Sequence, residues 1–306
     1  MSPARTLAAG QVCRIHTYDV ATGITTLVHS SDSVLFEAPN WAANGDLILN
    51  GDGLLWRLPA DGDGPADGDG PADGDGPADG DGPAPQRIPL DGVPELNNDH
   101  VLAPGGDTIY VSADDGHIYE APLGGGAARR VTHEDRLHFL HGVSPDGAAL
   151  AYVGIEPGNW DSAALFTIGR GGGPSTRLTS AGGRDDGPEY TPAGDWIYFN
   201  TELFTGRAQI ARIRPDGSDP QQLTDDERVN WFPHFAPDGG RAVYLSYPPG
   251  TQGHPADRRV QLRLVDGDGW KAPRTIAELP GGQGTINVNS WSPDGRRFAY
   301  VDYPIG

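Results

Sequence analysis

Cysteine is nearly absent from this chain of 306 residues, which has only Cys13. A single cysteine excludes an intrachain disulfide, and because free cysteines are often buried we expect a buried thiol on a strand. Long apolar runs are also missing. Residues 1–10 lack a stretch of signal-peptide length, and no run approaches the ~20 apolar residues of a membrane span. We therefore expect a cytoplasmic protein.

Positive charge is scarce: 22 Lys and Arg oppose 42 Asp and Glu, a formal net charge of −20. Binding to nucleic acid or to an anionic membrane needs clustered Lys and Arg, so we expect neither partner. Part of the acidity lies in Pro-Ala-Asp-Gly-Asp-Gly, which is repeated four times over 59–82. We expect a surface loop over 59–86, inserted in the first repeat, with weak calcium binding as the alternative.

Helical periodicity is almost absent, and a short hairpin pattern recurs instead. In 289–303, Trp291-Ser292-Pro293-Asp294-Gly295 gives turn chemistry and Phe298-Ala299-Tyr300-Val301 gives a strand fit for burial. Five further copies occupy 39–49, 100–111, 141–153, 188–199 and 233–245. A period in the forties with four short strands per repeat is typical of a β-propeller blade.

The repeated Trp-Ser-Pro-Asp-Gly hairpin resembles that of the TolB-like six-bladed β-propellers, over nearly the whole chain. The resemblance implies an all-β propeller of six blades, each of four antiparallel strands, in one domain over 1–306. TolB itself is periplasmic and has a separate N-terminal domain. Neither feature is visible here, so a role in the Tol envelope system is not carried over.

The two ends of the chain complement each other. Residues 12–29 form a hairpin that no hairpin of the repeat type precedes, whereas 289–303 supply two strands and the pattern then stops. We expect the N-terminal hairpin to provide the outer strands of the sixth blade, which would close the ring and remove open sheet edges.

Polar residues gather just before each repeat, where the first strand of a blade lines the channel. These segments and the loops between second and third strands should open on one face, opposite the Pro-Asp-Gly turns. Aromatic walls and convergent polar groups suit a small polar ligand such as a sugar. The candidate ligand-binding residues are Glu37, Asn40, Asn98, Trp160, Asp185, Asn230, Trp231, His254 and Asn287.

Four of the nine histidines, at 100, 138, 141 and 234, lie in these segments. His100 and His141 occupy the same position in successive repeats. Together with His234 and Gln283 they could hold one divalent metal ion, Mn, Ca or Zn, or they could simply pack beside the channel. Glu189 and His138 are the candidates for proton transfer, and an acidic solvated rim is the alternative for Glu189.

A second resemblance is to oligogalacturonate lyases, propellers that hold manganese with histidines and a glutamine. They have seven blades, whereas six are counted here. This resemblance implies a metal-dependent lyase or hydrolase acting on an oligosaccharide or sugar acid, with Arg136, Arg184 or Arg228 neutralising a substrate carboxylate. The preferred hypothesis is a propeller that binds a small, carbohydrate-like ligand, and a further alternative is a protein–protein interaction platform.

Overall fold

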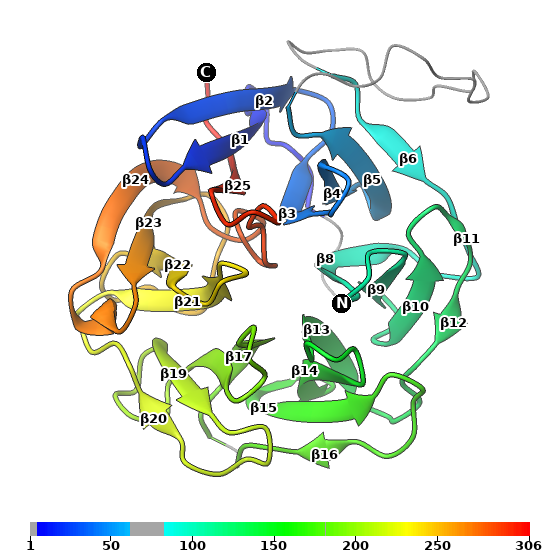
Figure 1. Ribbon diagram of the computed structural model, residues 1–306, viewed down its shortest axis with the longest axis vertical. Helices are drawn as coiled ribbons and strands as arrows, with labels where there is room; N and C mark the ends of the chain where they lie inside the picture. Colours follow the sequence, from blue (N-terminus) through cyan, green and yellow to red (C-terminus); the bar gives the residue numbers. More distant parts are fainter. Residues whose placement is uncertain (1–4, 62–82, 181) are drawn as a thin grey trace.

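The computed structural model describes residues 5–61, 83–180 and 182–306, which form a six-bladed β-propeller whose blades are arranged around a common central axis (Figure 1). The prediction of an all-β propeller is therefore confirmed. The first blade consists of β3 (Phe36–Trp41), β4 (Asp46–Gly51), β5 (Leu54–Pro59) and β6 (Gln86–Ile88). The second consists of β8 (Leu96–Leu102), β9 (Thr108–Ala113), β10 (Ile118–Pro122) and β12 (Arg129–Arg130). The third consists of β13 (Leu137–Val143), β14 (Ala149–Glu156), β15 (Asn159–Gly169) and β16 (Thr176–Arg177).

The fourth and fifth blades repeat this order of strands. They are β17 (Asp186–Tyr190), β18 (Ile197–Thr201), β19 (Gln209–Ile213) and β20 (Gln221–Gln222); and β21 (Val229–Phe235), β22 (Arg241–Tyr247), β23 (Arg258–Asp266) and β24 (Arg274–Gly281). A small parallel sheet of β7 (Leu90–Asp91) and β11 (Gly126–Ala127) links the outer edges of the first two blades. The element η1 (Gly269–Lys271) is a 3₁₀ turn, and no helix in the described part of the chain is long and apolar enough to cross a membrane.

The sixth blade joins the two ends of the chain. β1 (Cys13–Asp19) pairs antiparallel with β25 (Arg297–Asp302) on one side and with β2 (Thr25–Ser31) on the other. Residues 285–291 take the innermost position, where Ala299 N donates to Ser290 O at 3.0 Å. The N-terminal hairpin thus supplies the two outer strands, as the sequence predicts, and this closure ties the ring shut.

Apolar side chains pack between neighbouring blades, because each blade can bury its faces only against the next. Tyr110, Tyr152 and Tyr244 occupy equivalent second-strand positions, and all three are fully buried. Tyr110 and Tyr152 belong to one cluster that joins the second and third blades. Cys13 is buried on β1, as expected.

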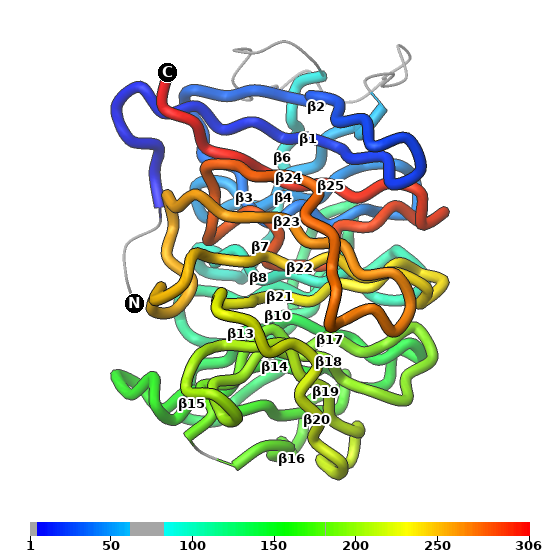
Figure 2. Tube along the Cα trace, turned by 90° about the vertical axis from the view of Figure 1, so that its left-hand side faces the viewer, coloured from blue at the N-terminus to red at the C-terminus, as the bar shows by residue number. Residues whose placement is uncertain are grey.

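The hairpin turns also pack against one another, on the end of the channel that we call the turn face (Figure 2). Four of the six turn glycines face the proline of the preceding blade: a Cβ on Gly194, for example, would lie 3.4 Å from Pro145, and one on Gly295 would lie 3.6 Å from Pro237. Both glycines have positive φ, 73° and 66°. The repeated Pro-x-Gly pattern therefore has a structural role, because it fixes how the turn of one blade packs against the turn of the next.

The insert predicted over 59–86 joins β5 to β6, the third and fourth strands of the first blade. Residues 62–82, with most of the hexapeptide repeat and its calcium hypothesis, lie outside the described residues.

Candidate functional site

A cavity of about 840 Å³ opens at the end of the channel opposite the turn face, which we call the cavity face. Its walls come from inner strands and from turns between second and third strands, among them Asp52-Gly53, Asp114-Asp115 and Pro157-Gly158. The N-terminal segment and the long loop between β22 and β23 lie at this same end, on the left of Figure 2. Turns of this type were expected on the cavity face, and the structure places them there.

Local irregularity of the inner strands shapes the cavity wall. In the first five blades, the pairing between first and second strand shifts register at the equivalent place, as between Leu140 and Gly142. Ala38, Gly187 and Phe232 occupy this place in their blades and have positive φ. Bulges of this kind redirect side chains, and consecutive residues such as Asn97, Asn98 and Asp99 can then all line the cavity.

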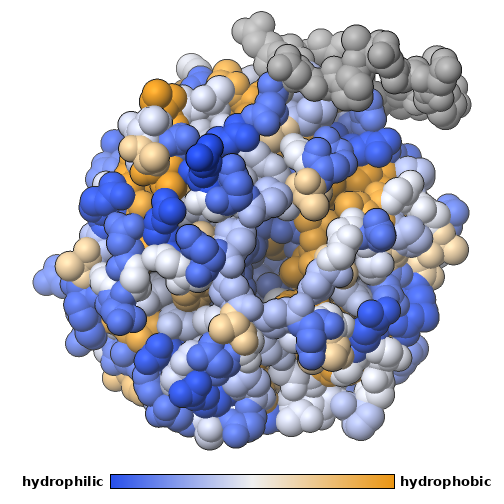
Figure 3. Space-filling model, viewed as in Figure 1, coloured by the Kyte–Doolittle hydropathy of each residue, from blue (hydrophilic) through white to orange (hydrophobic). Residues whose placement is uncertain are grey.

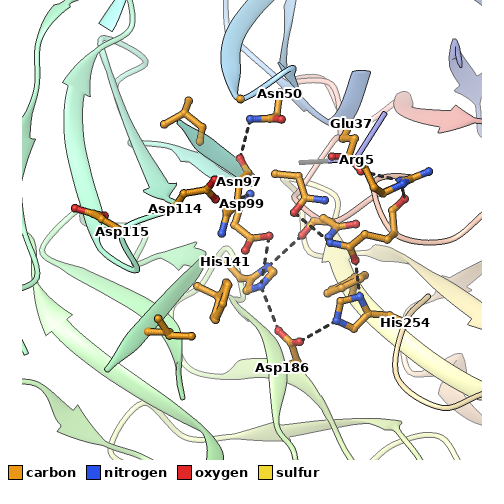
Figure 4. Close-up of a pocket in the computed structure, with 18 of the residues that line it drawn as sticks. Arg5, Glu37, Asn50, Asn97, Asp99, Asp114, Asp115, His141, Asp186 and His254 are labelled. Atoms are coloured by element: carbon orange, nitrogen blue, oxygen red, sulfur yellow. Dashed lines mark hydrogen bonds and ion pairs between the residues drawn. The ribbon is translucent and has the colours of Figure 1, made fainter. Parts of the chain in front are cut away.

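Polar side chains from five blades form a chain of contacts across the cavity floor (Figure 4). His141 Nε2 lies 3.2 Å from Asp186 Oδ1 and 3.8 Å from Asp99 Oδ1, and its Nδ1 donates to the Asn287 carbonyl at 3.2 Å. The chain continues through His254, whose Nε2 lies 3.5 Å from Asp186 Oδ2 and whose Nδ1 contacts Gln283 Oε1. Gln283 in turn donates to Asn98 at 3.2 Å.

Burial and the charges of neighbouring side chains determine which side chains of the cavity floor are ionised. Burial opposes the charged form of His141, but the carboxylates of Asp99 and Asp186 outweigh it and raise the pKa of this imidazole to about 9. Burial raises the pKa of Asp99 to about 6. Burial also opposes ionisation of Asp186, yet hydrogen bonds from His141 and His254 outweigh it, so the pKa of Asp186 lies well below its usual value. Perturbed groups of this kind cluster at functional sites.

Aromatic rings form the cavity walls. Trp160 is 58% exposed at the rim and stacks on Phe139, with ring centroids 5.9 Å apart. Deeper in, Phe232 stacks on His141 at 5.7 Å and meets His254 edge-on at 5.2 Å. An exposed indole face beside polar groups is the arrangement that stacks on a flat or sugar-like ring.

One further side chain enters the cavity from the N-terminal segment. Arg5 Nη1 donates to Glu37 Oε1 at 2.8 Å and to the Gln283 carbonyl at 2.6 Å (Figure 4). Burial raises the pKa of Glu37, and the charge of Arg5 opposes this shift. Arg5 was not among the predicted residues, because nothing in the sequence before residue 12 follows the repeat.

The structure brings together seven of the fifteen residues that the sequence singled out. They line the cavity: Glu37, Asn98, His141, Trp160, His254, Gln283 and Asn287. Asp99 and Asp186, which were not among the candidates, line it as well. The turn residues Asp52, Asp114 and Asp115 were missed, although their place between second and third strands put them on the expected face.

Four of the remaining candidates are buried between strands, away from this cavity. His138 Nδ1 donates to the Gly116 carbonyl at 2.7 Å, and burial lowers its pKa to about 4. Asn230 is held by Gln209 and Ser246, and Trp231 belongs to a core cluster although its ring lies beside His254. Asp185 is buried and does not line the cavity, unlike its neighbour Asp186.

A second, smaller cavity of about 480 Å³ opens on the turn face, where Figure 3 shows a hollow at the centre. Glu189 and Asn40 lie here, so these two candidates are separated from the others; His141 reaches both cavities. Glu189 accepts hydrogen bonds from Phe235 N at 2.8 Å and Asn289 Nδ2 at 2.7 Å, and it contacts His234 Nδ1 at 2.6 Å. These contacts fix the carboxylate within the wall.

The histidines proposed as metal ligands do not converge. His100 Nε2 faces the Ile48 carbonyl at 3.2 Å, His234 lies between Glu189 and the Ile286 carbonyl, and His141 alone of the three lines the large cavity. In residues 5–61, 83–180 and 182–306, no group of three or more His, Cys, Asp or Glu side chains is arranged to hold a metal ion. The proposed ligand set therefore does not fit a metal, and the metal itself stays a prediction.

Comparison with known proteins shows an extensive sequence match to an Agrobacterium protein. The chain is 40% identical over 275 residues to the uncharacterized protein Atu1656 of Agrobacterium fabrum, covering 88% of this chain and 85% of that protein. It is 30% identical over 146 residues to the TolB homolog of Chlorobium luteolum, of which it spans 32%. No family model matches the chain.

Solved structures give the same assignment of fold. The structure of a putative TolB from Agrobacterium tumefaciens superposes with a TM-score of 0.84 at 36% identity, covering 96% of this chain and 99% of that one. An oligogalacturonate lyase in complex with manganese gives 0.56 at 14% identity, covering 96% and 78%. At that identity the likeness to the lyase concerns the fold alone.

Proposed function

This chain belongs to the family of TolB-like propellers that includes Atu1656, and we propose that it binds a small, carbohydrate-like ligand in the cavity of the cavity face. The observation that carries the proposal is the pairing of an exposed indole at the rim with a connected polar floor. Trp160 offers a stacking face, and the chain from Asn98 to His141 offers hydrogen-bond partners for several hydroxyl groups.

The charged side chains that line the cavity indicate which ligands fit it. Among the described residues, six carboxyl groups line the cavity, against one guanidinium and two imidazoles; the carboxyl groups are those of Glu37, Asp52, Asp99, Asp114, Asp115 and Asp186. A ligand with its own carboxylate would be repelled by this excess of acid. We therefore propose that neutral or positively charged sugars bind in preference to sugar acids.

The same surroundings argue against the lyase alternative, which needs a cation beside the substrate carboxylate, because the Arg5 guanidinium in the lining is already paired with Glu37. The three candidate arginines do not line the cavity. Arg136 lies over the Phe166 ring at 4.2 Å, Arg184 pairs with Asp161 at 2.7 Å, and Arg228 donates to Ser246. Glu189 and His138, the candidates for proton transfer, are also absent from its lining. The proposal is therefore one of binding rather than of catalysis.

Titration calorimetry with neutral, aminated and acidic monosaccharides tests the proposal. We expect a neutral or aminated sugar to bind, and Trp160→Ala to weaken that binding about five- to tenfold, because a stacking contact contributes about 1–1.5 kcal/mol. Phe204→Ala is the matched control, since Phe204 is an exposed aromatic residue that does not line the cavity. Tighter binding of a sugar acid, or equal affinity in the two variants, would overturn the proposal.

A further inference from the structure

One wall of the ligand cavity already holds a cation, supplied by the chain itself. The Arg5 guanidinium donates from Nη1 to Glu37 Oε1 at 2.8 Å and to the Gln283 carbonyl at 2.6 Å. It also lies over the Tyr303 ring, 4.6 Å from the centroid. A carboxylate, a carbonyl and an aromatic face are the three groups that recognise a guanidinium or an ammonium ion.

The blades build this cradle independently of Arg5. Glu37 lies on β3, and Tyr303 follows β25 and anchors its hydroxyl to the Phe36 carbonyl at 2.9 Å. Gly284, with φ of 90°, closes the third side: a Cβ there would lie 2.5 Å from both Glu37 Oε1 and the Tyr303 hydroxyl. Glu37 and Tyr303 are both buried, so the cradle is part of the rigid propeller.

The segment that carries Arg5 is held much more lightly. Thr6, Ala8, Ala9 and Gly10 are exposed, and residues 5–10 belong to no strand. Its tethers to the rest of the protein begin at Gly10, whose carbonyl accepts from Gly306 N at 3.0 Å, and at Gln11, which donates to Asp257 at 2.7 Å. Ala8 N donates to Gln11 at 2.9 Å, which is a contact within the segment itself. Moving Arg5 out of the cradle therefore breaks few contacts besides those of its own guanidinium and the packing of Leu7.

We propose that Glu37, Tyr303 and the Gln283 carbonyl form a cation subsite of the ligand cavity, and that a guanidinium or ammonium group on the ligand takes the place of Arg5 there. This inference rests on the proposed function and narrows the ligand to a polar, sugar-like molecule with a positive charge. A buried carboxylate without its cation is strongly unfavourable. An incoming cation therefore restores the contacts that Arg5 gives up, and Arg5 acts as an internal competitor.

Competition predicts that the wild-type protein binds a cation at this subsite more weakly than a variant without Arg5, because the competent state is only a fraction of the population. The probe is methylguanidinium at millimolar concentration, added to wild type, Arg5→Ala, and Arg5→Ala combined with Glu37→Gln. Arg14→Ala is the matched control, since Arg14 is exposed on β1 and does not line the cavity.

We expect methylguanidinium to raise the Tm of Arg5→Ala saturably, and to raise the Tm of wild type and of Arg14→Ala only at about tenfold higher concentrations. By calorimetry it should bind Arg5→Ala about tenfold more tightly than wild type. The double variant should show neither effect, because it lacks the carboxylate. If Arg5→Ala does not fold, Arg5→Gln, which keeps much of the aliphatic stem, takes its place.

Two results would overturn the inference: a folded Arg5→Ala protein that does not bind methylguanidinium, or a double variant that binds it equally well. The monosaccharide titrations, repeated on the same proteins, separate this failure from failure of the proposed function. Sugar binding that depends on Trp160 without methylguanidinium binding refutes the subsite alone. Methylguanidinium binding that depends on Glu37 without sugar binding refutes the proposed function alone.

Discussion

The two ends of the channel are built on different rules. At the turn face the same residue types recur from blade to blade: five of the six turn glycines lie against the proline or alanine of the preceding turn, as Gly147 lies against Pro104 and Gly194 against Pro145. At the cavity face, equivalent segments carry different polar side chains. A closed ring needs identical contacts between its turns, whereas a ligand needs different groups on different sides. Residues that repeat from blade to blade therefore indicate the fold, and residues that differ at equivalent positions indicate the ligand site.

His100 and His141 show this difference at a single position of the repeat. Burial lowers the pKa of His100 to about 4, and the hydrogen bond to the neutral Ile48 carbonyl opposes this shift only in part. At His141 burial acts in the same direction, but two carboxylates outweigh it and raise the pKa to about 9. The same residue type at the same place is thus neutral where it only packs and charged where it faces the cavity.

We expect the largest loss of stability when a buried side chain near the turn face is truncated. Trp291 is buried, packs on Phe298 at 5.3 Å and donates from Nε1 to the His234 carbonyl at 3.1 Å. We expect Trp291→Ala to lower the free energy of unfolding by about 3–5 kcal/mol, measured by urea denaturation. Ligand affinity of the folded fraction should be unchanged, and a large loss of affinity would mean that the two ends are coupled.

The two histidines should give opposite dependences of stability on pH. The folded pKa of His141 lies above the unfolded value of ~6.5, so its stabilisation is complete below pH ~6.5 and is lost as the pH rises through 9. The folded pKa of His100 lies below that value, so stability is lost as the pH falls from ~6.5 through 4. Each limb amounts to about 3–3.5 kcal/mol.

Urea denaturation across pH 4–10 measures both limbs in His141→Gln and His100→Gln. We expect His141→Gln to flatten only the alkaline limb and His100→Gln to flatten only the acid limb. Identical pH profiles for the two variants would show that the position, rather than its surroundings, decides the charge.

A smaller effect is expected at the contacts between turns. Gly194 has positive φ and faces Pro145, so Gly194→Ala should destabilise the protein by about 1–2 kcal/mol without changing ligand affinity. Gly171→Ala is the control, because an added Cβ there would meet no atom within 4 Å and its φ is not in the positive range. Equal stability of the two variants would remove the structural role assigned to the turn glycines.

The smallest effect on stability should come from the residue that matters most for binding. Trp160 is exposed at the cavity rim, so Trp160→Ala should change the free energy of unfolding by less than about 0.5 kcal/mol. A loss of stability comparable to that of Trp291→Ala would make Trp160 a packing residue. Denaturation of the two variants side by side gives this comparison directly.

The sequence predicts the fold well because the fold depends on what repeats. Strand-turn-strand patterns identify the blades, and the unpaired hairpin at residues 12–29 identifies the closure. The site is only half predictable because it depends on which face of a strand a side chain takes. Leu137, Phe139 and His141 line the cavity while His138 between them does not, as the alternation of a strand requires. Bulges then interrupt that alternation near Asp99 and Phe232, and nothing in the residue pattern marks them.

A crystal of the protein soaked in a mixture of neutral and aminated monosaccharides tests the central claim most directly. We predict electron density for a sugar ring against Trp160, with hydroxyl groups on the polar floor around His141 and a charged group at Glu37 in place of Arg5. Density in the hollow of the turn face with the larger cavity left empty would contradict the account.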